Sequence, residues 1–305
     1  MPPEIAAVVK SLQPTQGRVS LPAANATLDL GDKYDFYGSE DAKKILVQLW
    51  GNPSEGVEGV LGLVMPAGAS PLSDSWGAVV TYQEAGFVSD DDAADVDYDE
   101  LLGQMREQET SENEQRKEAG YPEVHLAGWA KRPSYDPASH SVVWARDIVF
   151  ANEPKHSLNY DVRSLGRKGV LSINLVSTMD KLPQVQHAAA TFAKHAAFDT
   201  GSRYEDFDAS IDKEAEYGIA GLVAAGAGVA AAKKLGLLAI LLKFIKPIAI
   251  AGIAAFALLR KRIAALFGRK EDQSADWEWD SPAEPDAQEP EASDRPRTNQ
   301  NEPGG

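Results

Sequence analysis

Apolar residues recur along the chain with two different spacings, and each spacing predicts a different kind of element. In the stretch LNYDVR, Leu158, Tyr160 and Val162 alternate with Asn159 and Asp161. Such alternation is typical of a strand in a sheet that has one buried face and one face in water. Short apolar runs between turn residues predict further strands at 60–66, 76–82, 124–130, 141–150 and 170–176, and a hairpin within 17–30. The short connections favour antiparallel pairing.

Helical spacing appears in three other segments. Residues 39–50 and 98–105 each place apolar side chains on one face, and a third helix is predicted to begin at Pro183 and to run to about residue 196. Residues 106–120 are polar on every side and are expected to extend the second helix into solvent. The pattern predicts an α+β domain over 17–211, with an antiparallel sheet and about three helices, preceded by an N-terminal extension, 1–16.

The composition changes beyond Ile211, and residues 212–262 are predicted to anchor the chain in a membrane. A spanning helix needs about 20 apolar residues. Residues 235–259 are long enough, but Lys243, Lys246 and Pro247 lie near their middle. A central lysine costs about 2.5–3.5 kcal/mol on insertion scales. Two arrangements of a membrane anchor stay open: one transmembrane helix, or a helical hairpin whose first arm descends from about Tyr217. A soluble helical core is the alternative interpretation of this region.

The distribution of charge predicts on which side of the membrane each end of this region lies. Residues 218–270 contain nine Lys and Arg and no acidic residue. The basic group near Arg260 places the C-terminal end in the cytoplasm by the positive-inside rule, so one span would put the domain outside and two would put it inside. The N-terminus shows no basic and apolar signal pattern, which favours the cytoplasmic side of a bacterial inner (plasma) membrane for the domain.

The remaining composition excludes several classes of function. Residues 263–305 form a basic stub and an acidic, proline-containing tail that is predicted to be disordered. The net charge of -16 argues against nucleic acid as a partner, because nucleic-acid binding depends on Lys and Arg neutralising phosphates. Cysteine is absent, which excludes disulfides and cysteine-ligated zinc.

Basic residues around a predicted hairpin turn are the candidates for binding an anion. Arg163, Arg167 and Lys168 surround the turn at 166–169, where backbone amides and cations could hold a phosphate or carboxylate. A solvated turn is the alternative interpretation.

A weaker polar cluster comprises His125, Asp136 and His140, with Ser141 beside it. A Ser, His and Asp set is recognised by geometry, and the nucleophile motif G-x-S-x-G is absent. The acidic run 89–100 lacks the spacing of a calcium loop and is interpreted as compensating a helix N-terminus. The sequence therefore predicts no catalytic residue, no metal site and no cofactor.

Several motifs in consistent order resemble a known bacterial family. They are LWGNP, SWGAVVTYQEAGFVSDDDA, GYPEVHLAGWAKRPSYD, LNYDVRSLGRKGVL and DKEAEYGIAGLVA. The string resembles a family of predicted membrane-anchored proteins defined as a domain of unknown function, number 2167. The resemblance implies membrane attachment through the C-terminal region and implies no activity, substrate or cofactor.

The sequence favours a non-enzymatic interaction or scaffold module at the inner membrane. Its partners would be the lipid bilayer and a protein, or a second copy bound through the helix 218–232, which is rich in small residues. An envelope-associated hydrolase or small-ligand-binding enzyme is the alternative.

Overall fold

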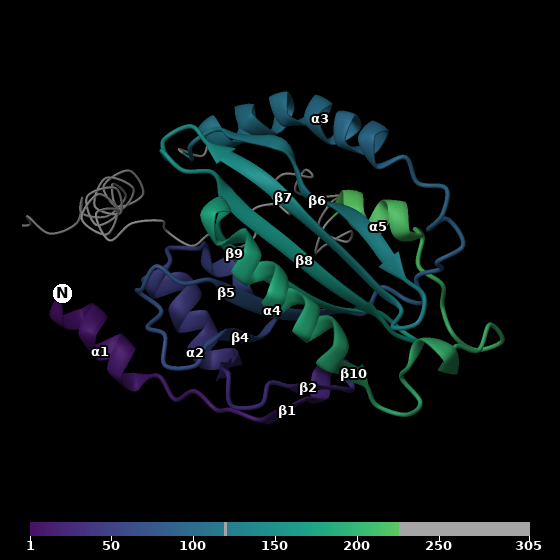
Figure 1. The fold of residues 1–305 in the computed structure, drawn as a ribbon, viewed down its shortest axis with the longest axis horizontal. Coiled ribbons are helices and arrows are strands. Elements are labelled where there is room, and N and C mark those ends of the chain that lie inside the picture. Colours follow the sequence, from purple (N-terminus) through teal and green to yellow (C-terminus); the bar gives the residue numbers. More distant parts are fainter. Residues whose placement is uncertain (119–120, 226–305) are drawn as a thin grey trace, which may run out of the picture. The chain divides into compact units, whose positions relative to one another are not determined.

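Antiparallel pairing joins two distant parts of the chain into one seven-stranded sheet (Figure 1). The computed structural model describes residues 1–118 and 121–225. In spatial order the strands are β3 (Tyr34–Gly38), β4 (Val60–Pro66), β5 (Gly77–Gln83), β9 (Val170–Thr178), β8 (Ser157–Leu165), β7 (Ser141–Phe150) and β6 (Val124–Asp136). The predicted antiparallel sheet and the α+β class are confirmed.

The pairing of β5 with β9 is the long-range join in this sheet. Gly77 lies opposite Val176, and Gln83 lies opposite Val170. On either side of this join, each strand pairs with its neighbour in sequence. The sheet is therefore two local meanders connected along a single seam.

A small second sheet lies beside the first. It contains β1 (Arg18–Leu21), β2 (Ala26–Asp29) and β10 (Ala196–Phe198) in that order, and β1 and β2 form the predicted hairpin. Its buried residues Ala26 and Leu28 belong to the same core as α4 (Leu182–His195).

One face of the large sheet is covered by α4 (Figure 1), and the core between the helix and this face is apolar. The helix begins with Pro183 in its first turn and buries Val185, Ala188, Ala189 and Phe192. Phe192 makes edge contacts with Tyr34 and Trp76. Leu158, Tyr160 and Val162 face this core, as their alternation predicts.

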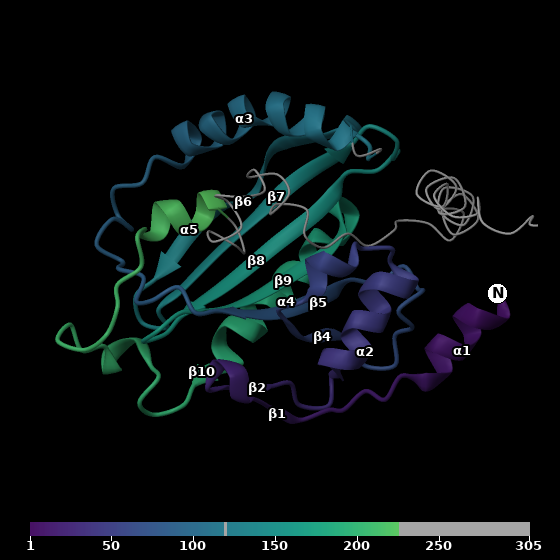
Figure 2. The ribbon, with the colours of Figure 1, turned by 180° about the vertical axis from the view of Figure 1, so that it is seen from behind.

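The opposite face is covered by separate helices (Figure 2). α2 (Ser39–Lys44) continues as a π-helix, Ile45–Leu49, and packs its apolar side chains over β4 and β5. α5 (Ile219–Ala225) packs against β7, β8 and β9. The N-terminal helix α1 (Pro3–Ser11) rests its half-buried side chains against the core under α2.

The polar helix α3 (Tyr98–Glu118) lies along β6. Asn113 exchanges two hydrogen bonds with the backbone of Val124, and the Glu109 carboxylate accepts one from the Leu126 N–H. The expectation that residues 106–118 extend into solvent is wrong. Polar side chains attach this helix to the backbone of the edge strand, and an apolar pattern cannot detect such contacts.

Most of the predicted membrane region lies outside the described residues. Within 1–118 and 121–225, no helix combines the length and the apolar character that crossing a bilayer requires. The predicted spanning residues 235–259 and the acidic tail 263–305 are not among the residues described.

Candidate functional site

Polar side chains gather at the centre of the sheet face that carries α5. Arg146 on β7, Asn159 and Asp161 on β8 and Asn174 on β9 lie side by side, because Arg146 pairs with Asn159 and Asp161 pairs with Asn174. Arg163 follows on the same face of β8. We call these five residues the arginine cluster. All five are buried, so the expectation that this side of β8 faces water is wrong.

Asp161 connects the two arginines of the cluster. Its Oδ2 accepts a hydrogen bond from Arg146 Nη2 at 2.9 Å, and its Oδ1 accepts one from Arg163 Nη2 at 2.6 Å. Asn174 Nδ2 donates to the same Oδ1 at 2.9 Å. Two guanidinium groups and one carboxylate leave the arginine cluster with one net positive charge.

Several donors in and beside the arginine cluster have no acceptor. The Nε and Nη1 groups of both arginines are buried without a hydrogen-bond partner, and so is the indole Nε1 of Trp144. Trp144 stands directly opposite Asp161, and the Arg163 guanidinium lies 5.4 Å from its ring centroid. Leaving a buried donor unpaired costs about 1–3 kcal/mol, and more for a charged group.

Burial also changes the acid and base behaviour around the arginine cluster. Desolvation lowers the pKa of Arg146 from its ordinary value, the Asp161 charge opposes that change, and Arg163 adds to it. Burial raises the pKa of Tyr217 to about 12, against the smaller effect of Arg163. The Tyr217 hydroxyl is therefore protonated at neutral pH, and it too is buried without a partner.

The predicted anion-binding residues contact different carboxylates. Arg163 lies in the arginine cluster, whereas Arg167 Nε donates to Asp212 Oδ2 at 2.6 Å. Lys168 Nζ lies 3.9 Å from the other oxygen of Asp212. Arg167 and Lys168 thus share an acidic partner at the turn between β8 and β9, and Arg163 points to another group.

The predicted polar cluster is distributed over three separate contacts. His125 Nδ1 lies 3.2 Å from Glu109 Oε2, and the His125 side chain is 52% exposed. Asp136 accepts a hydrogen bond from Ser139. His140 Nδ1 lies 2.9 Å from the Tyr135 hydroxyl, and its ring stacks on Tyr204.

The Asp90 carboxylate is hydrogen bonded to two tyrosines, a contact that the sequence did not indicate. The hydroxyls of Tyr135 and Tyr204 donate to its two oxygens at 2.5 and 2.9 Å. Burial raises the pKa of Asp90, but these two hydrogen bonds, together with the smaller effects of a backbone hydrogen bond and of His140, hold the pKa below its ordinary value. Burial and the same bonds to Asp90 raise the pKa of both tyrosines, so neither can act as a base at neutral pH.

Two other acidic residues of the run 89–100 cap the N-termini of helices. Asp97 accepts hydrogen bonds from the Asp99 and Glu100 N–H groups at the start of α3, as the interpretation of this run anticipates. Asp92 accepts from Ile219 and Ala220 at the start of α5. Among the residues described, no group of histidines and acids is arranged to hold a metal ion.

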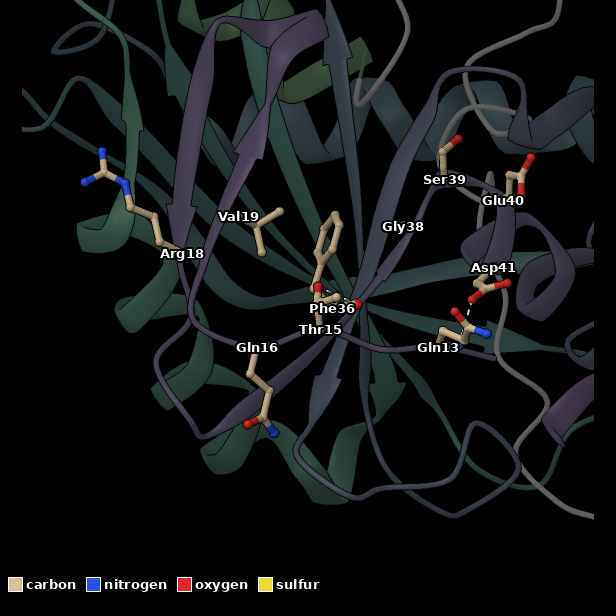
Figure 3. Close-up of a pocket in the computed structure, with 10 residues that line it drawn as sticks. All are labelled: Gln13, Thr15, Gln16, Arg18, Val19, Phe36, Gly38, Ser39, Glu40 and Asp41. Atoms are coloured by element: carbon tan, nitrogen blue, oxygen red, sulfur yellow. Dashed lines mark hydrogen bonds between the residues drawn. The ribbon is translucent and has the colours of Figure 1, made fainter. Parts of the chain in front are cut away.

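A polar hollow of about 620 Å³ lies between residues 13–19 and the junction of β3 with α2 (Figure 3). Backbone hydrogen bonds between Thr15 and Phe36, and one from the Gln13 N–H to Asp41, hold its walls together. Its charged side chains are Arg18, Glu40 and Asp41. Two carboxylates and one cation do not form a basic site, and this hollow is distinct from the arginine cluster.

Comparisons with known proteins identify a family and assign no activity. No curated protein matches the chain. A solved structure with some likeness is the solution structure of cyanobacterial PsbP (CyanoP) from Synechocystis sp., at 9% identity and a TM-score of 0.35, over 62% of this chain and 93% of that chain. That likeness is too weak to support an argument. The model of the family described as "Protein of unknown function (DUF2167)" matches residues 13–257, and the chain belongs to that family.

Proposed function

We propose that the protein is a non-enzymatic interaction module, tethered to the bacterial inner membrane by a single helix over residues 235–259. The observation that carries this proposal is the position of α5. This helix begins the apolar region 218–259 and is part of the folded domain.

α5 has a capped start and a buried face. The Asp92 carboxylate accepts hydrogen bonds from the N–H groups of Ile219 and Ala220 at 2.8 and 3.0 Å. Ile219, Leu222 and Val223 are at most 1% exposed and belong to the same core as Trp144. Residues 219–225 are therefore engaged with the sheet and are not free to enter a bilayer.

This packing supports one span over a hairpin. If 219–225 stay on the sheet, the first arm of a hairpin retains only residues 226–232 before Lys233. A helix of that length rises about 10 Å, against a hydrocarbon core of about 30 Å. Residues 235–259 are long enough to cross alone. With the basic residues Arg260, Lys261 and Arg262 in the cytoplasm, a single span puts the folded domain outside. This reverses the side that the sequence alone favours.

The geometry of the titratable groups supports binding over catalysis. His125 and His156 lie within 3.2 and 2.8 Å of carboxylates, but their side chains are 52% and 49% exposed. His140 contacts a tyrosine whose pKa is raised, and Asp136 contacts a serine. A nucleophile, base and orienting group do not converge among these residues.

Cysteine labelling of the full chain tests this proposal. The chain has no cysteine, so single replacements can be labelled without background. Ile211→Cys uses a side chain that is 73% exposed in the domain, and Ser274→Cys lies beyond the basic residues. In spheroplasts, a membrane-impermeant maleimide should label Cys at 211 directly and Cys at 274 only after permeabilisation.

The other labelling patterns contradict the proposal. Labelling of both positions only after permeabilisation would indicate a hairpin or a cytoplasmic domain. Recovery of the unlabelled parent protein in the supernatant after carbonate washing would reject the membrane anchor itself.

A further inference from the structure

We propose that the arginine cluster is a buried oxyanion-binding site that takes the carboxylate or phosphate group of a small molecule. This inference does not depend on membrane attachment, since every residue that carries it lies on β7, β8, β9 or in the residues leading to α5.

Five of the unpaired atoms in and beside the arginine cluster have one chemical character, whereas the sixth, the Tyr217 hydroxyl, can both donate and accept. Arg146 Nε and Nη1, Arg163 Nε and Nη1 and Trp144 Nε1 all donate hydrogen bonds and cannot accept them. A group rich in lone pairs satisfies such a set, whereas an amine or another hydrogen-bond donor does not. Carboxylates and phosphates provide several acceptor oxygens and bind guanidinium groups with two parallel hydrogen bonds.

The charge of the arginine cluster favours an anion. Asp161 neutralises one of the two guanidinium groups through its bonds to Arg146 and Arg163, so one positive charge remains uncompensated. An isolated charge in a buried site is costly. A bound anion removes that cost, which a neutral ligand cannot do.

The supporting framework is rigid. Asp161 is hydrogen bonded to both arginines and to Asn174, while Asn159 receives bonds from Arg146 and Asn174. Three adjacent strands position these groups, so little ordering is required when a ligand binds. Arg146, Asp161 and Arg163 are each at most 2% exposed, which favours an enclosed small group over a protein surface.

Thermal unfolding of the full chain in detergent tests the site. Inorganic phosphate, acetate and the water-soluble lipid dihexanoyl phosphatidic acid are each compared with chloride at equal ionic strength. A bound anion at a hundredfold excess over its Kd should raise Tm by about 5 °C or more. A larger response to the lipid than to phosphate identifies a headgroup as the source, and the reverse identifies a free solute. A Tm that does not depend on the anion overturns the proposal.

Two variants should change the response in opposite directions. Arg163→Gln removes a donor and the net charge, and should abolish the Tm increase. Asp161→Asn removes the competing carboxylate and should tighten phosphate binding by about tenfold or more, judged from the ligand-dependent shift alone. A merely structural role would not produce effects of opposite sign.

Further variants keep the test decisive. Arg132→Gln removes an exposed arginine that pairs with Asp99, and it should retain the full response. If Arg163→Gln does not fold, Arg146→Lys keeps the charge and should weaken the response through the loss of paired donors. Loss of the response in Arg167→Gln and not in Arg163→Gln would place the anion at the turn and overturn the proposal.

Discussion

The two faces of the large sheet differ although the same strands form them. Along β8, Leu158, Tyr160 and Val162 join the apolar core under α4, and the residues between them form part of the arginine cluster. Both sets are buried. Burial of apolar groups stabilises a fold, but a buried ion pair contributes little net stability once desolvation is counted. The comparison indicates that the face under α4 maintains the fold, and that the other face carries recognition at its centre.

Removing a large apolar group should have the largest effect on the face under α4. Phe192 is fully buried between Tyr34 and Trp76, and Phe192→Ala should lower the free energy of unfolding by about 3–5 kcal/mol. Urea unfolding followed by circular dichroism measures this change. Gln186→Ala on the exposed side of the same helix is the control and should stay within about 0.5 kcal/mol. Equal effects of the two changes would contradict the role assigned to this face.

The free energy of unfolding should change differently when one residue of the arginine cluster is replaced and when all three of its charged residues are replaced. Asp161→Ala leaves two buried guanidinium groups without their shared acceptor and should cost about 3–5 kcal/mol. The triple change Arg146→Met, Asp161→Leu and Arg163→Met makes the centre apolar and should be neutral or stabilising by about 1–4 kcal/mol. The triple variant should also lose the response to phosphate. A triple variant less stable than Asp161→Ala would show that the arginine cluster is needed for the fold.

Asp90 can be compared with Asp161. The Asp90 carboxylate accepts hydrogen bonds from two neutral tyrosines, whereas the Asp161 carboxylate accepts them from two arginines. Asp90→Asn should cost about 1–3 kcal/mol at pH 7, since hydrogen bonds to a charged group are lost. The lowered pKa means that the Asp90 contribution is present above the unfolded pKa of about 3.9 and disappears as pH falls through the folded value. Urea unfolding between pH 7 and pH 3 should therefore show the two proteins converging at acid pH. A constant difference over that range would mean that the Asp90 charge is not involved.

The sequence predicted the helices and strands better than it predicted which other elements cover each face of them. The apolar spacing of 183–196 gave the buried face of α4, because that spacing depends on local helix geometry. The alternation in β8 gave the strand and the correct apolar side. Alternation shows only that the two faces differ, and it cannot show whether other elements cover the polar face. The sequence pattern therefore places Arg163 with Arg167 and Lys168 around a turn, and it does not single out Arg146 or Asp161.

The other contacts that the sequence did not predict join residues that are far apart in the chain. Asp90 and Tyr204 are separated by 114 positions, and Asp92 caps a helix that begins 127 positions later. No local pattern links such residues. The charged residues in the middle of the strands WARDIVF and NYDVRS were the available signal, because central strands rarely bury charges without partners.

The seam between β5 and β9 has a consequence for synthesis on the ribosome. β5 emerges early, but its partner β9 follows only after α3 and three further strands. At a translation rate of about 5–20 residues per second, the valine-rich edge of β5 stays unpaired for several seconds. An unpaired apolar strand edge promotes aggregation. The nascent chain therefore passes through a stage at which this edge of β5 can pair with another chain.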